Sequence, residues 1–207
     1  MREIARLVLV LGLIAACSAA ALSYVRTALE PRIERQSDFY VRGPALERLF
    51  GAPASEVLGN KIIVEADGLS YPIFYFQTEG RLAGLAVEAP GKGGYGGDIV
   101  IMVGLDLESG KMLGVEIISH SETPGLGAQV EKASFRRQWR NLEIGSPAAL
   151  SGNGGRIDAI TGATYSSKAM IDGTNQIVDL LMKHEEDVRA MIARRDDRAS
   201  AESGRDR

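Results

Sequence analysis

Residues 158–167 (DAITGATYSS) place several hydroxyl side chains directly before a long stretch with helical periodicity. The first N–H groups of a helix lack intrahelical partners, and the helix dipole is positive at this end, so a phosphate is stabilised there. A hydroxyl in this segment is therefore a candidate to carry or contact a phosphate group. The alternative is that Thr164 or Ser166 caps the helix, because serine and threonine are preferred caps. The residue types leave both interpretations open.

Residues 91–96 (GKGGYG) satisfy the GxGxxG pattern of dinucleotide-binding folds, but the surrounding sequence does not fit. That pattern must open a helix, whereas residues 98–103 (DIVIMV) predict a strand. A phosphate-binding Walker loop is excluded as well, because Lys92 is followed by glycine instead of serine or threonine. We interpret the segment as a flexible loop that offers backbone N–H groups and one aromatic ring, Tyr95, to a planar ligand.

Residues 122–127 (ETPGLG) lie between a predicted strand and a predicted helix. Their backbone amides and the Thr123 hydroxyl are placed to face a ligand at the start of that helix. The alternative is a plain turn, in which proline and glycine only end one element and begin the next.

The elements that must position these segments are short strands joined by tight turns, beside separate helices. A helix is predicted over residues 44–50, because a proline stands at its start and Gly51 follows its end. Helical periodicity also covers residues 128–139 and residues 170–192. Apolar runs of strand length occupy residues 61–65, 71–77, 82–88, 98–105 and 112–119. This order predicts an α+β domain with a mostly antiparallel sheet and packed helices.

Composition limits the chemistry of the chain. Its 207 residues include 24 Lys and Arg against 27 Asp and Glu, a formal net charge of −3 that argues against nucleic acid as a partner. Cys17 is the only cysteine, so no intramolecular disulfide forms, and two histidines supply a metal site poorly. We therefore expect neither a metal site nor a catalytic residue set.

The N-terminal residues 7–25 carry no formal charge and approach the roughly 20 residues that a membrane-spanning helix needs. An uncleaved anchor, with residues 1–25 as cytosolic stub and membrane span, is our preferred interpretation. Cleavage after residues 19–21, or lipidation of Cys17 in a lipobox-like context, are the alternatives. Residues 26–60 then form a stalk and a short helix, residues 61–193 a domain, and residues 194–207 a disordered tail poor in apolar side chains.

Three motifs in order, GKGGYGG, SETPGLGA and DAITGATYSS, resemble the flavin-binding domain of the G subunit of the Rnf electron-transport complex. They also resemble the related C subunit of the sodium-translocating NADH:quinone reductase. The resemblance covers residues 61–181 and the N-terminal anchor. Its most specific part is the acceptor motif D-x-x-[S/T]-G-A-[S/T], which is matched by Asp158, Thr161, Gly162, Ala163 and Thr164.

This resemblance implies that FMN is joined covalently to Thr164 through a phosphoester bond, after a flavin transferase takes FMN from FAD and releases AMP. It further implies that Thr123 and Leu126 contact the flavin ring, with Tyr95 as a candidate neighbour. Lys168 is a candidate to pair with the phosphate. The remaining predicted cofactor-binding residues are Thr161, Gly162, Ala163, Glu122 and Gly125.

The function implied is that of a membrane-anchored FMN carrier on the extracytoplasmic side of the inner membrane, within an ion-translocating ferredoxin:NAD oxidoreductase. Its expected partners are the other membrane proteins of the complex, the flavin transferase and membrane lipid. The alternatives are the corresponding component of the quinone reductase and a flavin-bearing sensory module without an electron relay. A lipoprotein that binds a small ligand noncovalently is a further alternative.

Overall fold

The computed structural model describes residues 2–203, and the chain divides into two compact units, one ending at Val41 and one beginning at Arg42. The first unit contains α1 (Arg2–Ser37), which carries the uncharged N-terminal run. A π-helix follows over Asp38–Arg42, and its last residue is the first of the second unit. Among the described residues, one helix is long and apolar enough to span a bilayer, and it is this N-terminal one. None of the residues of α1 is buried by protein, which is what a helix surrounded by lipid requires.

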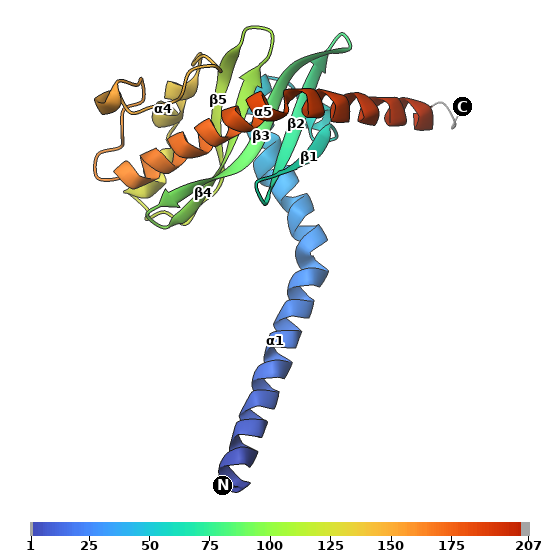
Figure 1. The fold of residues 1–207 in the computed structure, drawn as a ribbon, viewed down its shortest axis with the longest axis vertical. Coiled ribbons are helices and arrows are strands. Elements are labelled where there is room, and N and C mark those ends of the chain that lie inside the picture. Colours follow the sequence, from blue (N-terminus) through green and yellow to red (C-terminus); the bar gives the residue numbers. More distant parts are fainter. Residues whose placement is uncertain (1, 204–207) are drawn as a thin grey trace. The chain divides into compact units, whose positions relative to one another are not determined.

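The second unit is built on five strands, as the five apolar runs of strand length predicted. They are β1 (Lys61–Ala66), β2 (Leu69–Thr78), β3 (Arg81–Gly94), β4 (Gly97–Asp106) and β5 (Lys111–Ser119). Each strand pairs antiparallel with the next, and the sheet order is β1-β2-β3-β4-β5 (Figure 1). The predicted flexible loop at residues 91–96 is instead the end of β3 and the tight turn into β4, where Gly94 pairs with Gly97.

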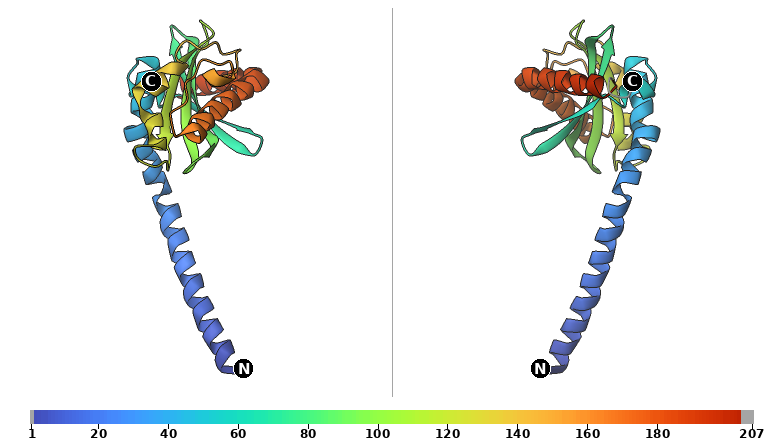
Figure 2. Two further views of the ribbon diagram at one scale, coloured as in Figure 1. Left: turned by 90° about the vertical axis from the view of Figure 1, so that its left-hand side faces the viewer. Right: turned by 90° about the vertical axis from the view of Figure 1, so that its right-hand side faces the viewer.

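Helices cover both faces of this sheet. The long helix α5 (Thr164–Ser203) packs on one face, while α2 (Gly43–Phe50) and α3 (Ala54–Val57) pack on the other (Figure 2). Strand alternation sends Ile73 and Tyr75 into the core beneath α5, and sends Phe74 between them into the core beneath α2 and α3. The predicted α+β class with an antiparallel sheet is therefore confirmed.

Glycine allows α5 to cross β3 at very short range. A Cβ atom added to Gly91 in β3 would lie 2.2 Å from the carbonyl oxygen of Ala169 in α5. A Cβ atom on Gly173 would lie 2.8 Å from the Cα atom of Gly91. Both values are far below an ordinary contact, so the crossing sets the position of the start of α5 relative to the end of β3.

The segment between β5 and α5 is more broken than its periodicity predicted. In place of one helix over residues 128–139, the structure has a 3-10 turn Gly127–Glu131, α4 (Ala133–Arg136) and a 3-10 turn Arg137–Trp139. Lys132, with extended dihedral angles (φ −64°, ψ 130°), separates the first two. Phe135 and Trp139 are both buried in the core, where Trp139 Nε1 donates a hydrogen bond of 2.8 Å to Thr174 Oγ1.

The C-terminal tail also differs from the prediction of disorder, because α5 continues to Ser203; residues 204–207 lie outside the described part of the chain. The helix bends at His184, whose dihedral angles are not helical (φ −121°, ψ 21°). Beyond the bend, the Asp196 carboxylate accepts hydrogen bonds from the Tyr75 hydroxyl (2.6 Å) and from Gln77 Nε2 (2.7 Å). Arg195 donates to the backbone oxygens of Gly59 and Lys61. These long-range polar contacts stabilise a helical segment that is poor in apolar residues.

Candidate functional site

The acceptor segment leads into α5, and Thr164 is the first residue of that helix. Its side chain is exposed, whereas the preceding Ala163 is buried. Gly162 has a positive φ of 80°, a conformation that glycine adopts without strain. The turn therefore presents the Thr164 hydroxyl to solvent beside the free N–H groups of the first helical turn. Thr161 is also exposed, but it lies in the turn before the helix.

Two serines that follow Thr164 in the first turns of α5 have structural roles. Both are buried, and Ser167 Oγ accepts a hydrogen bond from the backbone N–H of Ile160 and donates one to the carbonyl oxygen of Ala163. Ser166 Oγ donates to the carboxylate of Glu122 at 2.8 Å. Ser166 is thus not a helix cap, and neither serine presents a hydroxyl to solvent.

Glu122 joins the three segments that the sequence singled out. Its carboxylate is only 5% exposed and accepts hydrogen bonds from two sides. Oε1 accepts from the backbone N–H of Gly96 at 3.1 Å, in the turn between β3 and β4, and Oε2 accepts from Ser166 in α5. One side chain of the ETPGLG segment therefore connects the glycine-rich turn to the helix that begins with Thr164.

Glycines surround this carboxylate because larger residues would displace it. A Cβ atom on Gly127 would lie 1.9 Å from Glu122 Oε2, and one on Gly94 would lie 2.6 Å from Oε1. At Gly96 the obstacle is the backbone, since a Cβ atom there would lie 2.1 Å from the carbonyl oxygen of Ser121. The glycines of two motifs thus have a packing function around Glu122.

His120 fixes the backbone at Glu122. The Glu122 N–H donates to His120 Nδ1 at 3.0 Å, so the other ring nitrogen carries the proton in the neutral imidazole. That nitrogen, Nε2, lies 2.9 Å from Glu131 Oε1, to which it donates. His120 therefore orients the start of the ETPGLG segment through both of its ring nitrogens.

Apolar and aromatic side chains of the three segments are exposed. A Cβ atom on Gly162 would lie 3.1 Å from Leu126 Cδ1, so the ETPGLG segment touches the acceptor segment directly. Leu126 is 42% exposed and Tyr95, at the tip of the β3–β4 turn, is 76% exposed. Tyr165, which is not among the predicted site residues, is 68% exposed and follows Thr164 in the chain. Its position directly after Thr164, the predicted acceptor, was the available signal.

Three other predicted site residues are less constrained. Thr123 is exposed, and its backbone oxygen accepts from the N–H groups of Leu126 and Ala128, which closes the turn. Gly125 has a positive φ of 77° and open space around it. Lys168 is exposed four residues after Thr164, on the same side of α5 and one turn further along.

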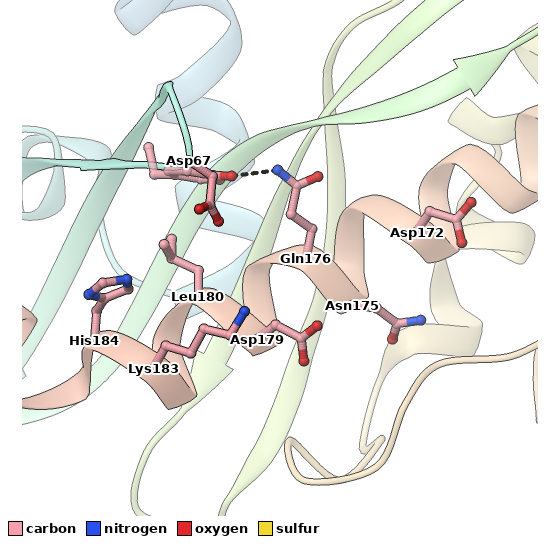
Figure 3. A pocket seen from close by; sticks show the side chains of 9 residues that line it. Asp67, Asp172, Asn175, Gln176, Asp179, Leu180, Lys183 and His184 are labelled. Carbon is pink, nitrogen blue, oxygen red and sulfur yellow. Dashed lines mark hydrogen bonds between the residues drawn. The ribbon is translucent and has the colours of Figure 1, made fainter.

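A polar pocket lies elsewhere, between the β1–β2 turn and the middle of α5 (Figure 3). Its volume is about 330 Å³, and Gln176 in its wall donates a hydrogen bond to the Tyr71 hydroxyl. None of the predicted site residues lines it; its walls include Asp67, Asp172, Asp179, Lys183 and His184. Among the described residues no group of histidine, cysteine or carboxylate side chains is arranged to hold a metal ion.

Comparison with known proteins identifies the family. The model of one protein family, described as the FMN-binding domain, matches residues 94–179, which include Glu122 and Thr164. The G subunit of the ion-translocating oxidoreductase complex from Methanosarcina acetivorans is 30% identical over 187 residues, with 89% of this chain and 97% of that protein covered. The protein of the same name from Pseudomonas aeruginosa is 30% identical over 184 residues, with 82% and 85% covered.

A solved structure shares the fold. The crystal structure of the C subunit of the Na(+)-translocating NADH-quinone reductase from Parabacteroides distasonis superposes with a TM-score of 0.56 at 20% identity. The match covers 74% of this chain and 94% of that one. Two relatives are 30% identical over most of their own length and of this chain, and the FMN-binding domain matches the segment that contains Glu122 and Thr164. The chain therefore belongs to the family of the G subunits of ion-translocating oxidoreductase complexes.

Proposed function

We propose that this protein transfers electrons within its complex through FMN joined to Thr164 Oγ1 by a phosphoester bond. The observation that carries the proposal is the exposure of the Thr164 hydroxyl at the first residue of α5, while Ser166 and Ser167 are buried and already hydrogen-bonded. The bound flavin supplies the redox chemistry, and the protein supplies position and electrostatics.

The residues around Thr164 fit a phosphate. The unpaired N–H groups and the positive dipole end of α5 stabilise negative charge at this position. Lys168 adds a positive side chain one turn further along the helix. Thr161 lies outside the helix and lacks this environment. The helix start therefore favours Thr164 over Thr161 as the point of attachment.

Attachment requires that the Thr164 hydroxyl reach a flavin transferase. Its oxygen forms the new bond to the flavin-side phosphorus of FAD, the phosphoanhydride bond breaks, AMP leaves and the hydroxyl proton is released. Gly162 and Ala163 before it are small, and Gly162 is exposed. The small neighbours leave an approach to the hydroxyl that a bulky side chain would obstruct.

Exposed side chains of the three segments fit a planar apolar ring. Leu126 touches the acceptor segment at Gly162, and Tyr95 and Tyr165 are exposed on the β3–β4 turn and on α5. An isoalloxazine ring placed on these side chains would remove their apolar surface from water. Glu122 maintains the spacing of the three segments and is itself buried.

The N-terminal helix anchors the protein in the membrane as a single span, with the FMN domain on the extracytoplasmic side. The support for the anchor is α1, the described helix that is long and apolar enough to span a bilayer. Covalent attachment is consistent with this topology, because an exported domain cannot recapture lost FMN from the cytosol.

Replacement of the acceptor hydroxyl tests the proposal. Thr164→Val keeps the β-branched shape and deletes only the hydroxyl, so the protein should fold normally and lose covalent flavin when it is coexpressed with a flavin transferase. Thr164→Ser should retain part of the labelling. Intact mass and in-gel flavin fluorescence measure both variants, and a flavin-sized mass on Thr164→Val would move the attachment site elsewhere, with Thr161 tested next.

A further inference from the structure

Four arginines surround one small hollow on the sheet face opposite α5. The hollow has a volume of about 90 Å³ and is lined by Arg48 of α2 and by Arg136, Arg137 and Arg140 of the segment after β5. Residues 113–116 of β5 also line it. We refer to this cavity as the arginine hollow.

The single carboxylate of the arginine hollow is already paired. Glu116 is 7% exposed, and its Oε2 accepts from Arg48 Nε at 2.8 Å while its Oε1 pairs with Arg136. Within the part of the chain that the structure describes, neither Arg137 nor Arg140 forms an ion pair. Four guanidinium groups around one carboxylate leave a local excess of positive charge in a chain whose net charge is −3.

The segment that carries three of the arginines is anchored by two buried aromatic side chains. Phe135 and Trp139 alternate with them in the chain, and their rings pack edge to face in the core with centroids 5.3 Å apart. Burial of these two rings directs the neighbouring arginines away from the core. Arg140 lies over Gly114, where a Cβ atom would be 3.6 Å from Arg140 Cγ. Glu116 holds the guanidinium groups of Arg48 and Arg136, and Arg137 Nε donates to the carbonyl oxygen of Ala133 at 3.3 Å. Groups that are already held lose less conformational freedom when a partner binds.

The arginine hollow is separate from the proposed flavin site. Glu116 of β5 lies opposite Met102 of β4 in the strand register, so both side chains are on the same face of the sheet. Met102 belongs to the core beneath α2 and α3, so the hollow lies on the α2 side of the sheet. Thr164 begins the helix that covers the other side (Figure 2). A partner can occupy the hollow while the flavin site stays accessible.

We propose that the arginine hollow docks an acidic side chain from a neighbouring protein of the complex. A guanidinium group presents paired N–H donors that match a carboxylate in two parallel hydrogen bonds, and a hollow of this size admits the end of one side chain. A lipid surface fits less well, because no exposed large apolar residue lines the hollow among the described residues. The inference rests on membership of a multi-subunit complex and is independent of how FMN is attached.

Charge reversal in the intact complex tests the docking. The variant Arg137→Glu with Arg140→Glu should lose the other subunits when the tagged chain is purified from solubilised membranes, and wild type should release them only at higher salt. The control Arg81→Glu with Lys183→Glu has the same change in charge at exposed positions outside the hollow, and should retain the subunits. Equal retention in all three proteins, or equal loss in both variants, would overturn the proposal.

A neutral variant and a crosslink separate the remaining explanations. Arg137→Gln with Arg140→Gln removes the charge without adding repulsion, and it should release the subunits at lower salt than wild type while its thermal unfolding stays unchanged.

A photoreactive amino acid at position 137 in membranes should crosslink to a peptide rich in Asp or Glu from another protein of the complex. A lipid adduct in place of that peptide would contradict the proposal and assign the hollow to the membrane surface.

Discussion

Glu122 is a buried carboxylate without a cationic partner among the described residues, and two protein donors satisfy it. They are the N–H group of Gly96 and the hydroxyl of Ser166. Buried charges are costly unless they are paired or hydrogen-bonded. The start of α5 offsets part of the cost of burying the Glu122 carboxylate, because Ser166 lies in the first turn of α5, where the helix dipole favours an anion. We infer that Glu122 positions the start of α5 against the β3–β4 turn.

Truncation of Glu122 should loosen the site. Glu122→Ala leaves the Gly96 N–H and the Ser166 hydroxyl without their partner, and each unsatisfied buried group costs about 1–3 kcal/mol. Glu122→Gln keeps one oxygen for Gly96 and an amide for Ser166, so it should recover most of the stability. Chemical denaturation of both variants gives the comparison, and equal losses for Ala and Gln would show that charge, not hydrogen bonding, is what the site needs.

At the scale of elements, the crossing of α5 over β3 depends on the absence of a side chain at Gly91. Gly91→Ala would place a methyl group 2.2 Å from the Ala169 carbonyl oxygen, so the helix and the strand must separate. Overpacking of this kind costs about 1–3 kcal/mol. Gly59→Ala is the matched control, because no atom lies within 4 Å of its added Cβ. Urea unfolding should show a loss only for Gly91→Ala, and an unchanged midpoint there would argue against the tight crossing.

The contact between the end of α5 and β2 should respond to alkaline pH. Burial, and then the hydrogen bond to Asp196, raise the pKa of Tyr75 from 10.0 to about 12. The folded state thus retains a proton that the unfolded state releases, and this contribution to stability is complete below pH 10 and disappears as the pH rises to about 12. The midpoint temperature of thermal unfolding should therefore fall more over this pH range for wild type than for Tyr75→Phe. Parallel curves would show that the contact contributes no pH dependence.

At the scale of the whole molecule, the proposed topology places every residue after the anchor outside the cytosol. Gly152 suits a cysteine probe, because it is exposed and its added Cβ meets no atom within 4 Å. On a Cys17→Ser background, Gly152→Cys should react with a membrane-impermeant thiol reagent in intact cells after the outer membrane, where present, is permeabilised. Cys17→Ser alone is the unlabelled control. Reaction only after lysis of the inner membrane would reverse the orientation.

The sequence alone determined the features that depend on local patterns. Apolar runs of strand length, such as residues 71–77, predicted the strands. Side chains on both faces of this run are apolar, so the structure was needed to assign each one to its core. The order of the three motifs indicated the family, and the apolar run of residues 7–25 indicated the N-terminal membrane helix. Each motif and each apolar run is a continuous stretch of the chain, so the local sequence is enough to recognise it.

Only the tertiary structure decided how distant segments meet. Glu122 is 44 residues from Ser166, and no local pattern indicates that their side chains pair. The interruption at Lys132 and the helical tail to Ser203 also differ from what the local pattern predicts. In that tail, Asp196 accepts hydrogen bonds from Tyr75 and Gln77, which lie 121 and 119 residues away in the chain. Arg48 and Arg140 come together for the same reason, since the sheet brings α2 and the segment after β5 to one face. Contacts between residues far apart in the chain depend on the packed fold, and the sequence near each residue does not contain them.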